Sequence, residues 1–257
     1  MEYAIELKNL SKTFARGSYQ VFSGVNLRIP RGKITFILGP SGAGKSVTLK
    51  HVLGILKPDA GEVLVFNQHI PYDSPEKLSQ MRKRFGMLFQ SAALFDDMTV
   101  FQNVAFPLME HRRNMPLEDV KQKVTEKLIA VGLDPKATLQ KYPNELSGGM
   151  KKRVGLARAI ILEPEILLYD EPTTGLDPMT RAMVDDLIIE TNEKFGLTSV
   201  VISHDLPSAL YSADYMAFLY KGKFVFFGTP EEFKKCDHEM IQAFLRSEER
   251  HRKEVHL

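Results

Sequence analysis

The stretch from Gly39 to Ser46, GPSGAGKS, has the spacing G-x-x-x-x-G-K-[ST]. Glycine permits backbone angles that turn successive N–H groups toward one anion, and a helix expected from Lys45 onward adds the positive end of its dipole. Lys45 would reach the β and γ phosphates of a nucleotide, and the Ser46 hydroxyl would ligate Mg²⁺. A glycine-rich turn without a ligand is the alternative. The apolar run over residues 34–38 directly before the loop favours nucleotide binding.

An acidic pair, Asp170 and Glu171, closes a second apolar run in the sequence ILLYDEP. Ligands of parallel sheets bind at the carboxyl ends of the strands, where Asp170 could hold Mg²⁺. Glu171 points elsewhere and could orient or deprotonate an attacking water. A solvated acidic pair before Pro172 is the alternative, but a phosphate-binding loop in the same chain favours the catalytic interpretation.

A histidine, His204, follows a third apolar run, TSVVIS. At the end of a strand beside a nucleotide it could donate a hydrogen bond to a γ-phosphate oxygen, although a single histidine is more often structural. We expect the other six histidines to lie at the surface, and none has metal-ligand spacing.

A serine and two glycines, Ser147, Gly148 and Gly149, stand at the start of another expected helix. They would form a second anion site by the same logic as the first loop. The alternative is an ordinary helix cap followed by a flexible turn.

The elements that must position these residues follow from hydrophobic periodicity. Alternation over the first 66 residues predicts a small antiparallel sheet around the strand and helix of the phosphate-binding loop. A helical pattern follows, then strands in α/β alternation, then a hairpin joined at Lys221-Gly222. The predicted fold class is α/β, with an antiparallel β-subdomain and an inserted α-helical subdomain. We expect one domain over 1–257, with the core and β-subdomain in 1–97 and 159–236, the helical subdomain in 98–158 and a helical tail in 237–257.

Charge, cysteine content and hydropathy argue against several classes of protein. The formal charge of +2 gives no support for a nucleic-acid groove, and Cys236 alone cannot form an internal disulfide, which fits a reducing compartment. The amino terminus does not resemble a signal peptide or anchor, and no apolar run approaches the ~18 residues that a membrane span requires. A role at a membrane would therefore need another chain to supply the spans.

The order GPSGAGKS, Gln90, LSGGM, ILLYDEP, GLDP, His204 resembles that of the ABC-type ATPases over nearly the whole chain. The resemblance implies a P-loop NTPase core of the RecA-like type, ATP hydrolysis and Mg²⁺. It implies that Gln90 touches Mg²⁺ and the transporter, and that Asp177 lies at a dimer interface. It places Phe14 under the adenine. The implied ATP-binding residues are Phe14, Gly39, Pro40, Ser41, Gly42, Ala43, Gly44, Lys45, Ser46 and Val47.

In this family the signature motif, here Ser147, Gly148, Gly149 and Met150, closes over the nucleotide bound by the partner. One signature per chain therefore implies a head-to-tail homodimer with two ATP between the subunits. The implied catalytic residues are Glu171, His204, Gln90 and Lys45, and the implied Mg²⁺ ligands are Ser46, Gln90 and Asp170.

Met150 stands where most members have glutamine. Loss of one side-chain hydrogen bond should cost about 1 kcal/mol, so we expect an active ATPase. Alternatively Met150 marks a subfamily, because LSGGM and the segment after Gln90 resemble the ATPases of Mla-type (MCE-associated) lipid transporters. In such ATPases this segment meets the permease, so its apolar residues are candidates for that surface or for local core: Leu94, Phe95, Met98, Val100 and Phe101.

The second resemblance implies the motor of a transporter that moves phospholipid or another hydrophobic molecule, at the cytoplasmic face of the inner membrane. It implies a multi-spanning permease (MlaE-like) and, in some complexes, an MCE-domain lipid-binding protein and a STAS-type regulator. An ATPase of an amino-acid or other small-solute importer is the first alternative. A non-transport ABC ATPase of DNA repair or translation is the second, but the near-neutral charge and the missing coiled-coil insertion count against it.

Overall fold

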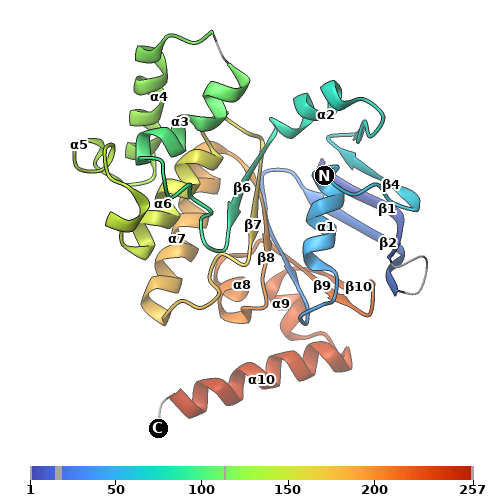
Figure 1. The fold of residues 1–257 in the computed structure, drawn as a ribbon. Helices are drawn as coiled ribbons and strands as arrows, with labels where there is room; N and C mark the ends of the chain where they lie inside the picture. The colour runs from blue at the N-terminus through green and yellow to red at the C-terminus, as the bar shows by residue number, and fades with distance from the viewer. Residues whose placement is uncertain (1, 15–18, 113, 256–257) are drawn as a thin grey trace. The chain divides into compact units, whose positions relative to one another are not determined.

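The structure is a computed structural model that describes residues 2–14, 19–112 and 114–255, with side chains up to residue 247 (Figure 1). Its contacts divide the chain into two compact units. The first unit combines Met1–Ile70 with Val201–Leu257, and the second unit is Pro71–Val200. Among the described residues, no helix is both long and apolar enough to cross a membrane.

The first unit contains the predicted antiparallel sheet, in the order β2-β1-β4-β5. Its strands are β1 (Tyr3–Phe14), β2 (Tyr19–Pro30), β4 (Ala60–Val65) and β5 (Gln68–His69). Ile5 and Leu7 of β1 lie opposite Ile29 and Leu27 of β2, and Ile5 also lies opposite Val65 of β4. All five of these side chains are buried, because alternate residues of a strand face the same side of a sheet.

The strand before the phosphate-binding loop, β3 (Ile34–Leu38), pairs in parallel with β9 (Tyr215–Tyr220). All of its residues are buried, as in strands that are covered on both faces. β9 pairs in antiparallel fashion with β10 (Lys223–Gly228), so the predicted hairpin is confirmed. Its turn residues Lys221 and Gly222 have φ of +45° and +69°, which explains the glycine.

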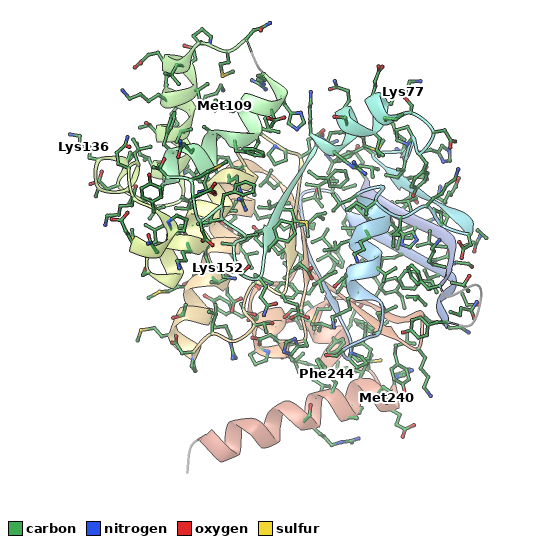
Figure 2. All side chains as sticks on the ribbon, viewed as in Figure 1. Lys77, Met109, Lys136, Lys152, Met240 and Phe244 are labelled. Carbon is green, nitrogen blue, oxygen red and sulfur yellow. The ribbon has the colours of Figure 1, made fainter. Side chains whose placement is uncertain are left out.

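The described residues of the first unit also form the helices α1 (Lys45–Val52), α8 (Leu206–Ser212), α9 (Pro230–Lys234) and α10 (Glu239–Val255). The charged helix expected from residue 237 is α10, and its beginning packs on the unit rather than standing in solvent. Ile241 is fully buried, and the ring centroids of Phe244 and Phe218 are 5.4 Å apart (Figure 2).

The second unit is mainly helical. Its helices are α2 (Pro75–Arg82), α3 (Val100–His111), α4 (Leu117–Ala130), α5 (Pro135–Thr138), the 3₁₀ helix η2 (Pro143–Glu145), α6 (Gly148–Ala159) and α7 (Pro178–Phe195). The described elements between residues 98 and 158 are all helical, as the sequence predicts. Val120, Val124 and Leu128 of α4 are buried at the spacing of one helix face. α6 lies at the centre of the unit, in contact with α3, α4, α7 and β6.

Two parallel strands of the second unit carry site residues at their ends. β6 (Phe85–Phe89) pairs with β7 (Ile166–Asp170), with Phe89 opposite Asp170. β8 (Thr198–Ile202) is the next strand beside β7, and the division between the units falls within it. β6 and α2 are elements that the sequence analysis did not identify.

Candidate nucleotide-binding and hydrolysis site

The phosphate-binding loop turns sharply between β3 and α1. Gly39 has a φ of +152°, and a Cβ built on it would lie 2.3 Å from the carbonyl oxygen of Leu219 in β9. Gly44 has a φ of +105°, and a Cβ there would lie 2.8 Å from Val21. Both positions therefore require glycine for space as well as for backbone angle. The Ala43 N–H donates to the Pro40 carbonyl at 3.2 Å and closes the turn between them.

Lys45 folds back over this loop. Its side chain is only 7% exposed, and Nζ donates to the carbonyl oxygens of Gly39 at 2.8 Å and Pro40 at 3.3 Å. The ammonium group therefore sits inside the turn where the sequence pattern places phosphates. Gly44 supplies no side-chain cap to α1, and the first turn of α1 has no acidic residue. Nothing negative in that turn thus competes with a phosphate for the helix dipole.

His204 belongs to the same unit as the loop. The Ser203 N–H donates to the carbonyl of Ile37 at 3.3 Å, one residue before the end of β3. This bond holds the backbone next to His204 against the strand that leads into the loop. His204 itself is exposed, so the fold brings an accessible histidine and the phosphate-binding loop to the ends of β8 and β3 in one unit.

Phe14 is the last residue of β1, and Tyr19 of β2 lies opposite it. Lys12 Nζ lies 5.7 Å from the centroid of its ring. The neighbouring Thr13 is held by Asp59, whose carboxylate accepts from the Thr13 N–H and Oγ1 and from Lys12 Nζ at 2.7–2.8 Å. These donors, Lys12 first, lower the pKa of Asp59 to about 2. The end of β1 that carries Phe14 is therefore anchored through its neighbours.

One histidine contradicts the sequence analysis. His51 of α1 is completely buried, where we expected a surface residue. Its Nδ1 lies 2.8 Å from the Val47 carbonyl, and the imidazole lies 5.9 Å from the ring of Phe22. Burial lowers the pKa of His51 below its usual value, so the neutral ring is favoured. The Val47 carbonyl and the Phe22 ring are contacts that accompany this burial.

In the second unit the ends of β6 and β7 bring three predicted site residues together. Asp170 ends β7 opposite Phe89 of β6, so Gln90 and Glu171 follow the paired ends of two adjacent parallel strands. The side chain of Gln90 is exposed, and Asp170 and Glu171 are half-buried. The fold thus places an amide and two carboxylates at one edge of the sheet.

Glu171 has a φ of +51°, in the left-handed region that residues other than glycine rarely occupy. Its Oε2 accepts from Thr174 Oγ1 at 2.9 Å, and its carbonyl accepts from the Thr174 N–H at 3.3 Å. Such backbone strain persists where the surroundings impose it, and it gathers at functional sites. Thr174 is a contact of Glu171 that the sequence analysis missed.

Ser147 caps α6, with its side-chain oxygen accepting from the Met150 N–H at 3.3 Å. Gly148 is exposed, and a Cβ added to it or to Gly149 would meet nothing within 4 Å. The capping bond involves the backbone of Met150, so it does not depend on the methionine side chain. Both the predicted helix cap and an open surface for an anion are therefore present in this motif.

Asp177 has a structural role that the sequence analysis did not predict. Its carboxylate caps α7 by accepting from the N–H groups of Met179 and Thr180 at 3.0 and 3.1 Å, and from Thr180 Oγ1 at 2.6 Å. The Thr180 side chain and these N–H groups lower the pKa of Asp177. The residue is exposed, so the cap leaves it accessible at the surface of the unit.

The segment after Gln90 is held by two side chains that the sequence analysis missed. Asn103 of α3 is completely buried and bonds the backbone of Phe95, Met98 and Thr99. Arg158 of α6 donates to the carbonyls of Ala92 and Ala93 at 2.6 and 2.8 Å. Sequence patterns give no signal for such bonds, because each depends on a carbonyl in another element.

The apolar residues that are candidates for a partner surface differ in their exposure. Val100 is completely buried, so of the two alternatives left open for it the local core holds. Phe95 is 40% exposed, and its ring lies 5.1 Å from that of Phe106, which is also exposed. Met109 on the same helix, α3, is exposed as well (Figure 2).

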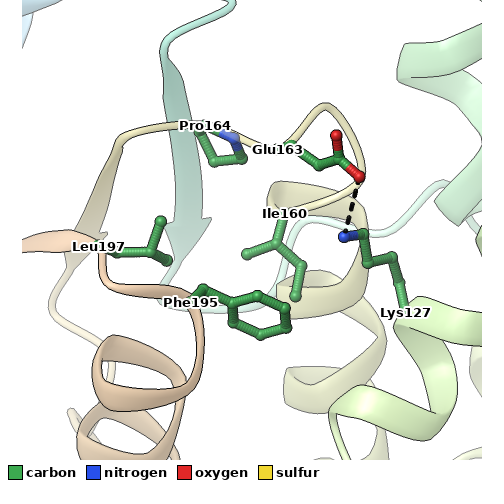
Figure 3. A pocket seen from close by; sticks show the side chains of 6 residues that line it. All are labelled: Lys127, Ile160, Glu163, Pro164, Phe195 and Leu197. Carbon is green, nitrogen blue, oxygen red and sulfur yellow. Dashed lines mark hydrogen bonds and ion pairs between the residues drawn. The ribbon is translucent and has the colours of Figure 1, made fainter.

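A pocket of about 150 Å³ in the second unit lies apart from all these residues (Figure 3). Lys127, Ile160, Glu163, Pro164, Phe195 and Leu197 line it. Lys127 Nζ lies 3.5 Å from Glu163 Oε1, so the charged rim is already paired. None of its lining residues is one that the sequence analysis selected.

The predicted metal ligands are oxygen donors. The described residues contain no group of three or more His, Cys, Asp or Glu side chains that could hold a metal ion. The predicted ligands are a hydroxyl (Ser46), an amide (Gln90) and one carboxylate (Asp170). Oxygen donors of this kind fit Mg²⁺, which keeps waters and takes further oxygens from nucleotide phosphates.

Comparison with known proteins identifies the family. The ABC transporter family model matches residues 22–174. The chain is 45% identical, over 95% of its length and 90% of the relative, to the intermembrane phospholipid transport system ATP-binding protein MlaF of Haemophilus influenzae. It is 44% identical to MlaF of Escherichia coli K12, over 94% and 88% of the two chains. It is 40% identical, over 95% and 67%, to a probable ribonucleotide transport ATP-binding protein of Mycobacterium tuberculosis.

Solved structures agree with this assignment. CbiO1 from Clostridium perfringens, part of the ABC transporter complex CbiONQ, superposes with a TM-score of 0.83 at 29% identity, covering 96% of this chain and 100% of that one. The dimeric bacterial ABC transporter cassette MJ0796 superposes with a TM-score of 0.76 at 33% identity, covering 88% and 98%. MJ0796 is also known in a post-hydrolysis state bound to ADP and Pi. This chain therefore belongs to the ABC transporter family, as a nucleotide-binding ATPase subunit with the P-loop NTPase fold.

Proposed function

We propose that this chain is the ATP-hydrolysing motor of a transporter that moves phospholipid or a similar hydrophobic molecule through a separate permease. The observation that carries the substrate class is the 45% identity, over nearly the whole chain, to MlaF of Haemophilus influenzae, an intermembrane phospholipid transport system ATP-binding protein. The relative named for ribonucleotide transport is less similar, at 40%. Met150 and the segment after Gln90 add to this support, because in both this chain resembles the Mla-type ATPases.

We assign the binding of ATP to the loop Gly39–Val47, with Phe14 under the adenine. Lys45 exchanges its two loop carbonyls for the β and γ phosphates, since its ammonium already lies inside the turn. His204 donates to a γ-phosphate oxygen. The glycines at 39 and 44 support this assignment, because the close packing around the loop leaves no room for a Cβ at either position.

We assign hydrolysis to Glu171, which orients and deprotonates the attacking water. Its left-handed backbone and its bond to Thr174 fix the carboxylate for that task. Ser46, Gln90 and Asp170 would hold Mg²⁺, which neutralises phosphate charge during phosphoryl transfer. In the proposed cycle, ATP binding closes the dimer, and the Gln90 segment transmits this conformational change to the permease. ATP hydrolysis then reopens the dimer.

We propose a head-to-tail homodimer in which Ser147, Gly148, Gly149 and Met150 face the nucleotide of the partner and Asp177 lies at the interface. The dimeric structure of MJ0796 supports this assembly. We also propose an MlaE-like permease, an MCE-domain lipid-binding protein, a STAS-type regulator and a place at the cytoplasmic face of the inner membrane. Exposed Phe95, Phe106 and Met109 are the proposed permease contacts.

Two variants test the ATPase assignments. Glu171→Gln should bind ATP, accumulate as a closed dimer and lose steady-state hydrolysis, as measured by phosphate release and size-exclusion chromatography with ATP. Lys45→Ala should instead lose most of its nucleotide affinity, as measured by fluorescent-nucleotide titration. Normal hydrolysis by both variants would refute the assignment of these residues.

Purification tests the substrate class. The tagged chain is extracted from its native membrane in mild detergent, and mass spectrometry identifies the proteins and lipids that accompany it. A multi-spanning permease, an MCE-domain protein and bound phospholipid are expected. A permease of another transporter class without lipid would overturn the lipid assignment and leave the ATPase chemistry standing.

A further inference from the structure

Lys152 of α6 is a buried cation that neither the sequence analysis nor the family comparison assigns a role. It lies five residues after Ser147 and is only 7% exposed (Figure 2). In the part of the chain that the structure describes, its Nζ makes no ion pair and donates to two backbone carbonyls. Burying an ammonium group without a carboxylate is unfavourable, so stability alone does not explain this lysine.

Both carbonyls belong to the loops that carry the proposed hydrolysis residues. Lys152 donates to the carbonyl of Gln90 itself and, at 2.9 Å, to that of Pro172, the residue after Glu171. Gln90 and Glu171 follow the paired ends of β6 and β7. One side chain therefore connects the two loops at the edge of the sheet where the amide and the carboxylates gather.

The bond to Pro172 acts next to a strained residue. Glu171 has a φ of +51°, and such a conformation persists only where neighbouring groups hold it. On one side of Glu171 is β7, and on the other side the backbone is held by Lys152 at the Pro172 carbonyl and by the Thr174 N–H, which donates to the Glu171 carbonyl. Loss of the Lys152 bond would leave the Glu171 backbone freer to relax.

The helix that carries Lys152 begins at the signature motif. Ser147 caps α6, and Lys152 lies between one and two helical turns further on, so a movement of the motif also moves Nζ. Arg158 of the same helix binds the carbonyls of Ala92 and Ala93. Arg158 thus holds the segment after Gln90, whereas Lys152 bonds both Gln90 and the loop that follows Glu171.

We propose that Lys152 is a positioning residue that fixes the Gln90 and Glu171 loops against the signature helix, so that contact of the signature with a nucleotide orders the hydrolysis residues of the same chain. This inference rests on the proposed roles of Gln90, Glu171 and the signature motif. A rigid link of this kind changes the rate of hydrolysis more than the affinity for ATP, because none of its bonds involves the phosphate-binding loop.

The test compares three lysine variants in the full chain, purified with its native partners. Lys152→Met keeps the length and apolar stem but removes the donors, Lys152→Arg keeps donors, and Lys151→Met makes the same change at the adjacent, half-exposed position. Steady-state hydrolysis gives kcat and KM, and hydrogen exchange without nucleotide reports on the peptides that contain residues 90–93 and 171–175.

We expect Lys152→Met to lower kcat at least tenfold, to change KM less than twofold and to speed amide exchange in both peptides. Lys152→Arg should recover much of kcat, and Lys151→Met should match the unaltered chain. A kcat for Lys152→Met within twofold of the unaltered chain, or unchanged exchange in the 171–175 peptide, would overturn the proposal. A parallel Glu171→Gln variant that still hydrolyses ATP would instead refute the catalytic assignment on which the proposal rests.

Discussion

Replacement of Asn103 by leucine should loosen the segment after Gln90 without touching the nucleotide-binding residues. The Asn103 amide is fully buried, with Oδ1 accepting from the Phe95 N–H at 2.8 Å. Its Nδ2 lies 3.0–3.1 Å from the carbonyls of Phe95, Met98 and Thr99. Leucine has nearly the same volume and makes none of these bonds, so packing changes little while four backbone groups lose a bond to the amide. The Phe95 and Thr99 carbonyls keep the N–H groups of Met98 and Asn103 as donors.

The size of the effect follows from these contacts. Each net hydrogen bond is worth about 1 kcal/mol, and a buried polar group left unsatisfied costs about 1–3 kcal/mol. The two Nδ2 hydrogens are shared among three carbonyls, and the leucine gains apolar burial, so the total is smaller than four full penalties. We expect a loss of about 3 kcal/mol in the free energy of unfolding, or roughly 6–12 °C in Tm.

Thermal unfolding followed by circular dichroism measures the loss, with Asn114→Leu as the matched control because Asn114 is exposed. Limited proteolysis should also cut the variant faster within residues 91–99 than the unaltered chain. A Tm within about 2 °C of the control would mean that the amide contributes little, and the reasoning from its four contacts would be refuted.

Three further predictions concern the loop, the signature and the buried histidine. Gly39→Ala should lower the free energy of unfolding by about 2–4 kcal/mol, because its Cβ would lie 2.3 Å from the Leu219 carbonyl, whereas Gly42→Ala should cost about 1 kcal/mol, since nothing lies within 4 Å. Urea unfolding compares the two, and equal losses would contradict the steric argument. Met150→Gln should change kcat less than tenfold in an ATPase assay, because the Ser147 cap bonds the backbone at 150; a change of several orders of magnitude would disprove this. Burial lowers the pKa of His51, so the unfolded chain binds more protons below the ordinary histidine pKa of about 6.5 and stability should fall as pH drops through that value. Urea unfolding at pH 7.5 and 5.5 should show a weaker pH dependence in His51→Leu, and an identical dependence would show that His51 is not responsible.

Short apolar runs explain why the core strands could be predicted from sequence. Residues 34–38, 166–170 and 198–202 consist mainly of apolar and β-branched residues, each stretch ends at or before a polar residue or glycine, and the structure has strands with these bounds. The predicted ligand-binding and catalytic residues come directly after the carboxyl ends of these strands, where parallel sheets bind their ligands. The motif spacing then identifies the loop at 39–46 without knowledge of the fold.

The side chains that hold the loops could not be predicted in the same way. Lys152 stands in the run MKKRVGLARA, where it is indistinguishable by pattern from the adjacent Lys151. Its partners are 62 and 20 residues away in the chain, so its burial depends on how β6 and β7 align beside α6. His51 was misjudged for a related reason, since a polar ring within a helix can be buried when its own turn supplies a carbonyl, here that of Val47.

The charges at three helix starts distinguish the roles assigned to them. α7 begins with the carboxylate of Asp177, which already satisfies two N–H groups and would repel a phosphate. α6 begins with the neutral hydroxyl of Ser147, and α1 begins at Gly44 with no side-chain cap. Because an anion is favoured at a helix start only where no fixed negative charge precedes it, α1 and α6 can face phosphates and α7 cannot. The same reasoning predicts that Ser147→Asp would cap α6 as the serine does but would repel the phosphates, so ATP should no longer produce a closed dimer in size-exclusion chromatography.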